Sequence, residues 1–198
     1  MAKNKGVLFI VSAPSGTGKT TLCRRILPSI PGIERSVSCT TRPPREGEVH
    51  GKDYVFLSDS DFDRMLAQGK FAEWAQVYGY RYGTLKKTIA DSLKKSRDLL
   101  LEIDVQGART LRKEFGAQAV TIFLTPPSLK ELRRRLEKRG KDTRKMMEAR
   151  FTKAIKEIAQ RKYYDYIIVN DSLTEAGEKL KAIILAERQR TERVHKKL

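Results

Sequence analysis

The stretch that decides the fold is VLFIVSAPSGTGKTT, residues 7–21. It consists of an unbroken apolar run, a glycine-rich turn and a Lys-Thr-Thr that opens a predicted helix. A phosphate-binding loop (P-loop) has Gly, four residues, Gly, Lys and then Ser or Thr, because its backbone N–H groups curl around a phosphate. Gly16, Gly18, Lys19 and Thr20 fit this pattern, whereas Ala13 holds the leading Gly position and therefore requires a negative φ. The alternative is a glycine-rich turn without a ligand, but a strand, loop and helix in this order favour the P-loop.

The composition predicts one compact enzyme that attracts anions. The chain has 198 residues, and 41 Lys and Arg against 24 Asp and Glu give a net charge of +17. Such a charge attracts nucleotides, phosphates or nucleic acid and does not choose among them. Cys23 and Cys39 follow no metal or disulfide spacing, and the opening MAKNKG is too short for a signal peptide. No apolar run approaches the roughly 20 residues that span a membrane, so we expect a soluble, cytoplasmic protein without a membrane partner.

Alternating strand and helix patterns predict a doubly wound α/β fold around a parallel sheet, with helices on both faces. Apolar runs without polar alternation are typical of strands buried on both faces, and they cover residues 7–11, 99–103, 120–124 and 166–169. Helical patterns cover residues 20–27, ended by Pro28 and Pro31, and residues 106–115, 129–139, 143–163 and 173–194. Ser128 and Glu131 predict a capping box for the third of these helices.

Two regions interrupt this alternation. Residues 36–88 are rich in Gly, Pro and aromatic residues, with one brief helical pattern at residues 59–68, which predicts an inserted small antiparallel β-rich subdomain facing a substrate. The charged, Gly-containing stretch at residues 138–145 indicates a mobile lid between two helices. We therefore expect a single domain made of a core (1–35, 89–137 and 156–198), an insertion (36–88) and a helical lid (138–155).

Motifs along most of the chain resemble those of guanylate kinases, P-loop nucleoside monophosphate kinases that transfer a phosphoryl group from ATP to GMP. After the P-loop, the motifs that carry the resemblance are SCTTRPPREGEVHGKDYVF at 38–56, FAEW at 71–74, YGYRYGT at 78–84, EIDVQG at 102–107 and IIVND at 167–171. The resemblance implies ATP as phosphoryl donor, GMP and dGMP as acceptors, Mg²⁺ as the metal and a role in purine nucleotide metabolism.

The resemblance also assigns the ATP site and its metal. Lys19 would reach the β and γ phosphates, and Thr20 would place its hydroxyl on Mg²⁺, with Asp104 assisting through a water molecule. The alternative for Lys19 is a solvated lysine at a helix start. The ATP-binding residues implied are Ala13, Pro14, Ser15, Gly16, Thr17, Gly18, Lys19, Thr20 and Thr21, with Asn170 near the adenine.

The GMP site is predicted in the insertion. Arg42 and Arg45 are separated by two prolines, and a guanidinium can grip phosphate oxygens in bidentate fashion. By resemblance they hold the GMP phosphate, and an exposed basic turn is the alternative. The other residues implied for this site are Tyr54 and Tyr82 as hydroxyl donors to the phosphate, Ser38 and Thr84 as hydroxyl contacts, and Glu73 and Asp104.

A carboxylate selects guanine because N1–H and the N2 amino group are both donors, a pair that the corresponding edge of adenine lacks. Glu73 and Asp104 match the guanine-reading positions of the family. The alternative for Asp104 is a helix cap at a strand end. Glu102 is expected to share the strand face of Asp104 and is only an indirect candidate.

Three arginines match those that guanylate kinases bring over the transferred phosphate when a lid closes: Arg135, Arg139 and Arg150. They are candidate catalytic residues together with Lys19, Arg42 and Asp104. A solvated basic face is the alternative, and we assign it to Arg133 and Arg134 and to the tail at residues 187–198. Arg144 and Lys145 stand where the family has carboxylates, which affects the energetics of lid closure.

Three other functions compete with this assignment. A scaffold module related to these kinases would lack a working P-loop, whereas Lys19 and Thr20 are present. A nucleic-acid-binding protein would explain the charge, but the chain shows no recognised DNA or RNA module. A P-loop kinase with another acceptor is the closest rival, and the joint presence of Glu73 and Asp104 favours guanine. The sequence leaves the oligomeric state open.

Overall fold

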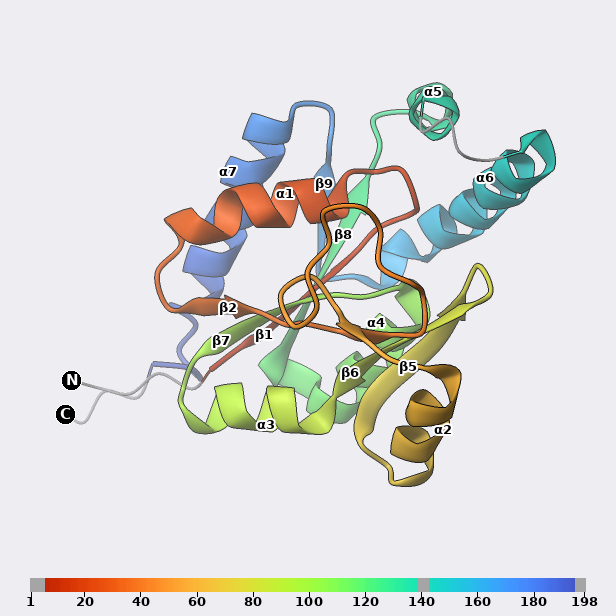
Figure 1. The fold of residues 1–198 in the computed structure, drawn as a ribbon. Helices are drawn as coiled ribbons and strands as arrows, with labels where there is room; N and C mark the ends of the chain where they lie inside the picture. Colours follow the sequence, from red (N-terminus) through yellow and green to blue (C-terminus); the bar gives the residue numbers. More distant parts are fainter. Residues whose placement is uncertain (1–5, 139–142, 195–198) are drawn as a thin grey trace.

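A five-stranded parallel sheet forms the centre of the molecule. The computed structural model describes residues 6–138 and 143–194 (Figure 1). Every strand pair in the central sheet is parallel, and the strand order is β2-β7-β1-β8-β9. The strands are β1 (Leu8–Ser12), β2 (Ile33–Arg35), β7 (Asp98–Glu102), β8 (Ala119–Thr125) and β9 (Tyr166–Val169). The four predicted strands are confirmed to within two residues at each end, and β2 is an addition.

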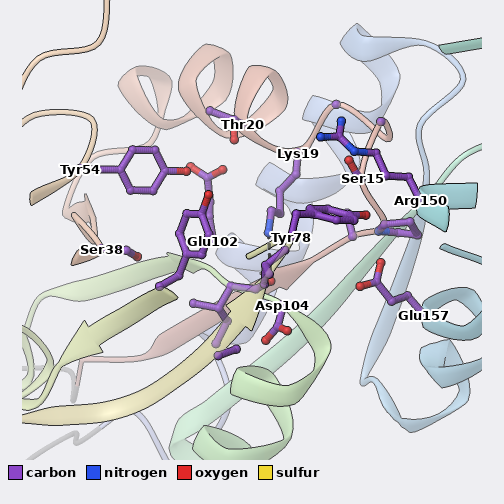
Figure 2. Close-up of a pocket in the computed structure, with 18 of the residues that line it drawn as sticks. Ser15, Lys19, Thr20, Ser38, Tyr54, Tyr78, Glu102, Asp104, Arg150 and Glu157 are labelled. Carbon is purple, nitrogen blue, oxygen red and sulfur yellow. Dashed lines mark hydrogen bonds between the residues drawn. The ribbon is translucent and has the colours of Figure 1, made fainter. Parts of the chain in front are cut away.

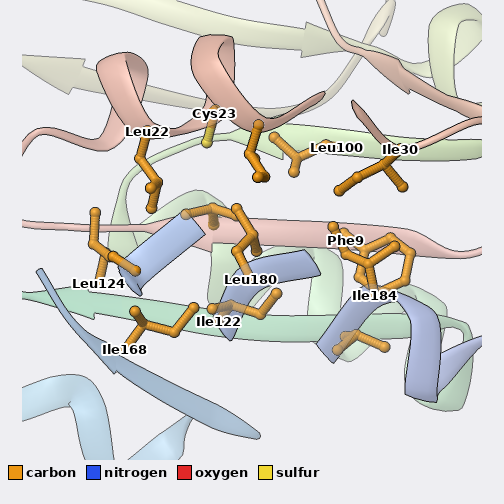
Figure 3. Packing of buried hydrophobic residues seen from close by; sticks show 14 of the residues in the cluster. Phe9, Leu22, Cys23, Ile30, Leu100, Ile122, Leu124, Ile168, Leu180 and Ile184 are labelled. Carbon is orange, nitrogen blue, oxygen red and sulfur yellow. The ribbon is translucent and has the colours of Figure 1, made fainter. Parts of the chain in front are cut away.

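Helices cover both faces of this sheet because alternate residues of its buried strands point to opposite sides. On one face, Phe9 and Val11 of β1 pack against α1 (Lys19–Ile26) and α7 (Leu173–Glu187). Figure 3 shows Phe9 in this cluster with Leu22, Leu180 and Ile184. On the other face, Leu8 and Ile10 pack against α3 (Lys86–Lys94) and α4 (Val105–Phe115). The doubly wound α/β fold is therefore confirmed.

The insertion forms a second, smaller sheet that is mixed and not purely antiparallel. Its order is β4-β3-β6-β5, and its elements are β3 (Cys39–Thr40), β4 (Val55–Phe56), α2 (Asp59–Ala67), β5 (Phe71–Val77) and β6 (Tyr80–Leu85). The β3–β6 and β5–β6 pairs are antiparallel as predicted, whereas β3 and β4 are parallel. The reason is that the chain from Thr41 to Tyr54 returns to the start of β3 before β4 begins. Phe62 of α2 stacks on Phe71 at a centroid distance of 4.4 Å and closes a small core of its own.

Two helices pair beside the P-loop, α5 (Leu129–Glu137) and α6 (Arg144–Ala159). Leu132 and Leu136 of α5 pack against Ala154 of α6. Arg133, predicted on a solvated face, keeps a partly exposed side chain, which pairs with Glu148 at 2.6 Å and lies over the Phe151 ring. The two helices thus form one compact unit.

The start of α5 shows only half of the predicted capping box. The Ser128 hydroxyl accepts the backbone N–H of Glu131 at 3.1 Å, as expected of an N-cap. The Glu131 carboxylate turns instead to Arg134 and Arg135, which donate to it at 2.7 Å. Hydrogen bonds from these arginines lower the pKa of Glu131 to about 2.

Helix ends differ from the sequence prediction where tertiary contacts decide them. Short 3₁₀ turns follow α1 (Leu27–Ser29), α4 (Gly116–Gln118) and α6 (Gln160–Tyr163). Helix α7 ends at Glu187 and not at residue 194, because Arg193 folds back and donates to the Glu187 carbonyl at 2.8 Å. Arg193 also pairs with the Glu187 carboxylate, and the two residues are 5% and 3% exposed. Glu187 and Arg193 are therefore buried, contrary to the prediction of a solvated face, whereas residues 189–192 are exposed as predicted.

Within the described ranges, we find no helix with the length and apolar character needed to cross a bilayer.

Candidate active site

The P-loop joins the carboxyl end of β1 to the first turn of α1. Gly16 and Gly18 have φ values of 90° and 92°, which only glycine adopts without strain. Ala13 is not among the described residues with positive φ, so alanine is compatible with the leading position. Gly18 is the N-cap of α1 and offers no side chain, and the first turn of this helix has no acidic residue. The first backbone N–H groups of α1 can therefore bind an anion.

Asn170 supports the P-loop from behind. It follows β9, is 4% exposed, and its Nδ2 donates to the Thr17 carbonyl at 2.6 Å. A Cβ atom on Gly18 would lie 2.9 Å from the same nitrogen, so glycine is needed for this close approach. On another side, a Cβ atom on Gly16 would lie 3.0 Å from Leu136 of α5. Asn170, predicted near the adenine, thus contacts the loop backbone and is not in the cavity wall.

A cavity of about 270 Å³ lies between the P-loop, the end of β7 and the second sheet. In Figure 2, Tyr54 and Ser38 lie on one side of Lys19, and Arg150 and Glu157 lie on the other. Most predicted site residues line this cavity: Ala13, Pro14, Ser15, Gly16, Gly18, Lys19, Thr20, Thr21, Ser38, Arg45, Tyr54, Glu73, Tyr82, Asp104 and Arg150. The predicted residues Thr17, Arg42, Thr84, Arg135 and Asn170 are not in its wall. Arg139 lies outside the described residues.

Lys19 crosses the cavity floor from α1 to the end of β7. Its Nζ donates to the Ile103 carbonyl at 2.9 Å. Its positive charge lowers the pKa of Glu73 and of Glu157, although burial of these carboxyl groups has the larger, opposite effect. Lys19 therefore places a positive charge on the cavity floor, in a wall that also holds Glu73, Glu157 and Asp104.

Glu73 is a buried carboxyl group held on two sides. It is 6% exposed, and the Thr84 hydroxyl donates to its Oε1 at 2.5 Å. Burial, with a contribution from the charge of Asp104, raises the pKa of Glu73 to about 7, and the Thr84 hydrogen bond opposes this rise. On the Oε2 side, Gly107 of α4 leaves the space that the carboxylate occupies, since a Cβ atom there would lie 2.3 Å from Oε2. Thr84 thus acts through Glu73 from outside the cavity wall.

Asp104 caps a helix and also lines the cavity, so both interpretations considered from the sequence apply to it. Its Oδ1 accepts the Gly107 backbone N–H at 2.9 Å and caps α4. The same residue lines the cavity next to Ile103. The cap fixes the carboxylate at the carboxyl end of β7, where parallel α/β sheets bind ligands.

The two arginines of the insertion differ in their surroundings. Arg45 lines the cavity and is exposed. Arg42 is 7% exposed, and its Nη2 lies 2.8 Å from both oxygens of Glu48. Its guanidinium also lies over the rings of Tyr54 and Phe56. Arg42 therefore braces the tyrosine in this structure, and its partner Glu48 was not singled out from the sequence.

The lid arginines are also in different surroundings. Arg150 of α6 lines the cavity, and its guanidinium lies 4.7 Å from the centroid of the Tyr78 ring. Arg135 of α5 is paired with Glu131 at 2.7 Å. Of the two predicted lid arginines among the described residues, Arg150 thus lines the cavity and Arg135 does not.

Sequence reasoning missed Tyr78 and Glu157 and gave Glu102 a minor place. Tyr78 has a φ of 51° in the β5–β6 turn, and the Tyr-Gly pair at this turn was the available signal. Glu157 is 8% exposed on α6, and only tertiary packing brings it to the cavity. Glu102 pairs with Arg35 at 2.7 Å, while its Oε2 is buried without a hydrogen-bond partner in the described structure.

The fold and this cavity define a P-loop nucleotide-binding protein of the α/β class. Comparisons with known proteins narrow the class. The family model described as guanylate kinase matches residues 5–187. The guanylate kinase of Geobacter sulfurreducens is 52% identical over 192 residues, which cover 97% of this chain and 94% of that protein. The guanylate kinase of Geobacter metallireducens is 50% identical over the same shares of both chains.

A solved structure agrees with these relatives. The crystal structure of guanylate kinase from Anaplasma phagocytophilum superimposes with a TM-score of 0.83 at 36% identity, covering 98% of this chain and 92% of that one. The chain belongs to the guanylate kinase family.

Proposed function

We propose that the chain transfers the γ-phosphoryl group of ATP to GMP, and to dGMP, giving ADP and the nucleoside diphosphate. The observation that carries the proposal is that the P-loop and the buried carboxyl group of Glu73 line one cavity. Family membership supports the same reaction. From family membership we propose that this activity serves purine nucleotide metabolism in the cytoplasm.

On the ATP side, the N–H groups of the P-loop and of the first turn of α1 would surround the phosphates. Lys19 would exchange its bond to the Ile103 carbonyl for the β and γ phosphates. Asn170 holds the loop in place through Thr17, and we assign it this supporting role in place of an adenine contact.

On the GMP side, the ionised Glu73 would accept the N1–H and N2 donors of guanine. Thr84 and Gly107 set the position of its two oxygens. Arg45 would bind the GMP phosphate, with Tyr54, Tyr82 and Ser38, which line the same cavity, as hydroxyl donors nearby.

Mg²⁺ fits the donor groups on the cavity wall. Thr20 offers a hydroxyl, Asp104 offers a carboxylate, and Glu102 has an unpaired buried oxygen within the described structure. Hydroxyl and carboxylate oxygens are the ligands Mg²⁺ prefers, with phosphates and water completing its shell. When bound, Mg²⁺ would neutralise charge on the phosphates.

During transfer, an oxygen of the GMP phosphate forms a bond to the γ phosphorus as the bond to the ADP oxygen breaks. The protein mainly aligns the two nucleotides and stabilises the charge on the equatorial oxygens. We assign that stabilisation to Lys19 and Arg150, which line the cavity, and to Arg135 and Arg139 after lid closure. Arg135 would leave Glu131 to do so. Arg42 would act by bracing Tyr54.

We keep the division into core, insertion (36–88) and lid (138–155) as part of this proposal. Because α5 packs on α6, we extend the moving lid to include Leu129–Glu137.

The test is a coupled assay of ADP release with ATP and Mg²⁺ against GMP, dGMP, AMP, CMP and UMP. We expect turnover with the two guanine nucleotides and loss of on the order of 10³-fold in Lys19→Ala. Lys87→Ala, an exposed lysine on α3, is the matched control and should behave as wild type. Equal turnover of AMP and GMP, or activity of Lys19→Ala near the wild-type value, contradicts the proposal.

A further inference from the structure

A second cavity, of about 620 Å³, lies on the face of the sheet covered by α4. Its walls are α4, the 3₁₀ turn Gln160–Tyr163 and Thr121 of β8. Val105, Ala108, Arg109 and Arg112 lie along one face of α4, at positions i, i+3, i+4 and i+7. No residue of this wall belongs to the wall of the active-site cavity, so the two cavities are separate.

The wall of the second cavity carries positive charge and no acidic residue in the described structure. Arg112 is fixed by Asp165 at 2.8 Å and by the Tyr163 carbonyl. Arg109 and Lys162 line the cavity from α4 and from the 3₁₀ turn, and neither is paired with a carboxylate among residues 6–138 and 143–194. Two cations without counter-ions in a concave surface favour an anion such as a phosphate.

An aromatic and apolar surface adjoins these cations. Tyr163 is 59% exposed although it lines the cavity, and Lys162 lies 5.1 Å from the centroid of its ring. Val105 and Ala108 supply the apolar part of the opposite wall. An exposed tyrosine beside unpaired cations is the combination that binds a base by stacking and its phosphate by charge.

We propose that this second cavity binds a mononucleotide, with its phosphate between Arg109 and Lys162 and its base against Tyr163. Its volume lies within the range of about 300 to 1,000 Å³ that is typical of small-molecule sites. Few polar groups of the wall are available to a base, because the Thr121 hydroxyl already donates to Asp165 at 2.7 Å and the Tyr164 hydroxyl is buried, so we expect the site to discriminate weakly among bases. This inference concerns a site outside the active-site cavity and does not rest on the proposed reaction.

The experiment distinguishes binding in the second cavity from binding in the active-site cavity by saturating the active-site cavity first. The active-site cavity is saturated with an adenosine–guanosine pentaphosphate, a bisubstrate compound, and its binding is measured by calorimetry. A fluorescent N-methylanthraniloyl derivative of AMP is then titrated into the blocked protein. We expect one further equivalent of probe to bind. Failure of the bisubstrate compound to bind would count against the proposed function. In that case the titration with the fluorescent probe is done with an excess of GMP and of a non-hydrolysable ATP analogue in place of the bisubstrate compound.

Two double variants provide the matched comparison. Arg109→Ala with Lys162→Ala removes both unpaired cations of the cavity, and we expect the affinity for the probe to fall about tenfold or more. Lys113→Ala with Arg161→Ala removes the same charge from the same two elements but outside the cavity wall, and should leave the affinity within about twofold. Tyr163→Ala should lower the affinity for the nucleotide probe and leave the affinity for inorganic phosphate, measured by competition, unchanged.

Three results would overturn the proposal. They are the absence of binding to the blocked protein at millimolar probe, an equal loss of affinity in both double variants, and binding of a single-stranded RNA 12-mer without binding of the mononucleotide. The last result would assign the surface to nucleic acid. Equal circular dichroism spectra and unfolding midpoints for the two double variants exclude misfolding as the cause of a difference.

Discussion

Gly107 offers the sharpest test of how the guanine-reading carboxylate is placed. In the change Gly107→Ala, the new Cβ atom would lie 2.3 Å from Oε2 of Glu73 and 2.9 Å from its Cδ. The carboxylate must therefore retreat by about 1.1 Å to reach 3.4 Å, where ordinary contact begins. Thr84 holds the other oxygen at 2.5 Å, so the whole carboxylate cannot pivot without losing that bond.

The expected result is a loss of GMP recognition in a stable protein. A displacement of about 1 Å at a reacting or binding group costs on the order of 10²-fold, so kcat/KM for GMP should fall by about that factor. The KM for ATP should change little, because the atoms nearest to the new Cβ belong to Glu73 and to the Ile103 side chain and not to the P-loop. Alanine has a higher helix propensity than glycine by about 1 kcal/mol, so α4 itself is not weakened by the change.

Steady-state kinetics with varied GMP, in both the wild-type and the Glu73→Gln backgrounds, measure this effect. If Gly107 acts through Glu73, the two substitutions are not additive, and Gly107→Ala costs little once the carboxylate is gone. Thr110→Ala, on the exposed side of α4, is the control and should match wild type. A kcat/KM for GMP within threefold of wild type in Gly107→Ala would refute the reasoning.

Three further predictions concern charge. The pKa of Glu73 in the folded protein, about 7, lies above the ordinary value of 4.5, so its contribution to stability is full below pH 4.5 and is lost as the pH rises through 7. Glu73→Gln should therefore gain up to about 3 kcal/mol over wild type between pH 4.5 and 8 in urea unfolding, while GMP affinity of the wild type rises over the same range. Arg193→Met should cost about 3 to 5 kcal/mol because it leaves the buried carboxylate of Glu187 without its main partner. Arg45→Ala should raise the KM for GMP about tenfold or more, because a charged contact to phosphate is lost.

Each of these predictions has a control. Glu114→Gln, an exposed glutamate of α4, should show no pH-dependent gain in stability over wild type. Arg190→Met removes the exposed partner of Glu187 and should cost less than about 1 kcal/mol. For Arg45, the KM for ATP serves as the internal control. Parallel stability curves for wild type and Glu73→Gln, equal costs for Arg190 and Arg193, or an unchanged KM for GMP would contradict the respective argument.

The sequence predicted the fold where patterns are local and buried. Apolar runs without alternation located the strands of the central sheet because both of its faces are covered, as Leu8 and Phe9 show. The short strand β2 was missed because three half-buried residues carry no such pattern. The end of α7 was misplaced because Arg193 terminates the helix through a tertiary contact.

The site was predictable where a motif fixes the backbone and not where packing from distant elements decides. The P-loop glycines lie in the predicted loop between β1 and α1 with positive φ values, and Asp104 lies at the predicted strand end. Glu48 and Glu157 could not be chosen among many charged residues, since their roles depend on Arg42 and on the packing of α6.

The bond between Asn170 and the Thr17 carbonyl makes the phosphate loop part of the edge of the sheet. Residue 170 directly follows β9, the last strand in the order, so the loop cannot unfold without detaching from that edge. ATP would then meet a loop that is already ordered, and little of its binding free energy would be spent on restricting backbone motion. Loosening of β9, far along the chain from the P-loop, should accordingly appear first as weaker nucleotide affinity and faster amide exchange at Thr17 to Lys19.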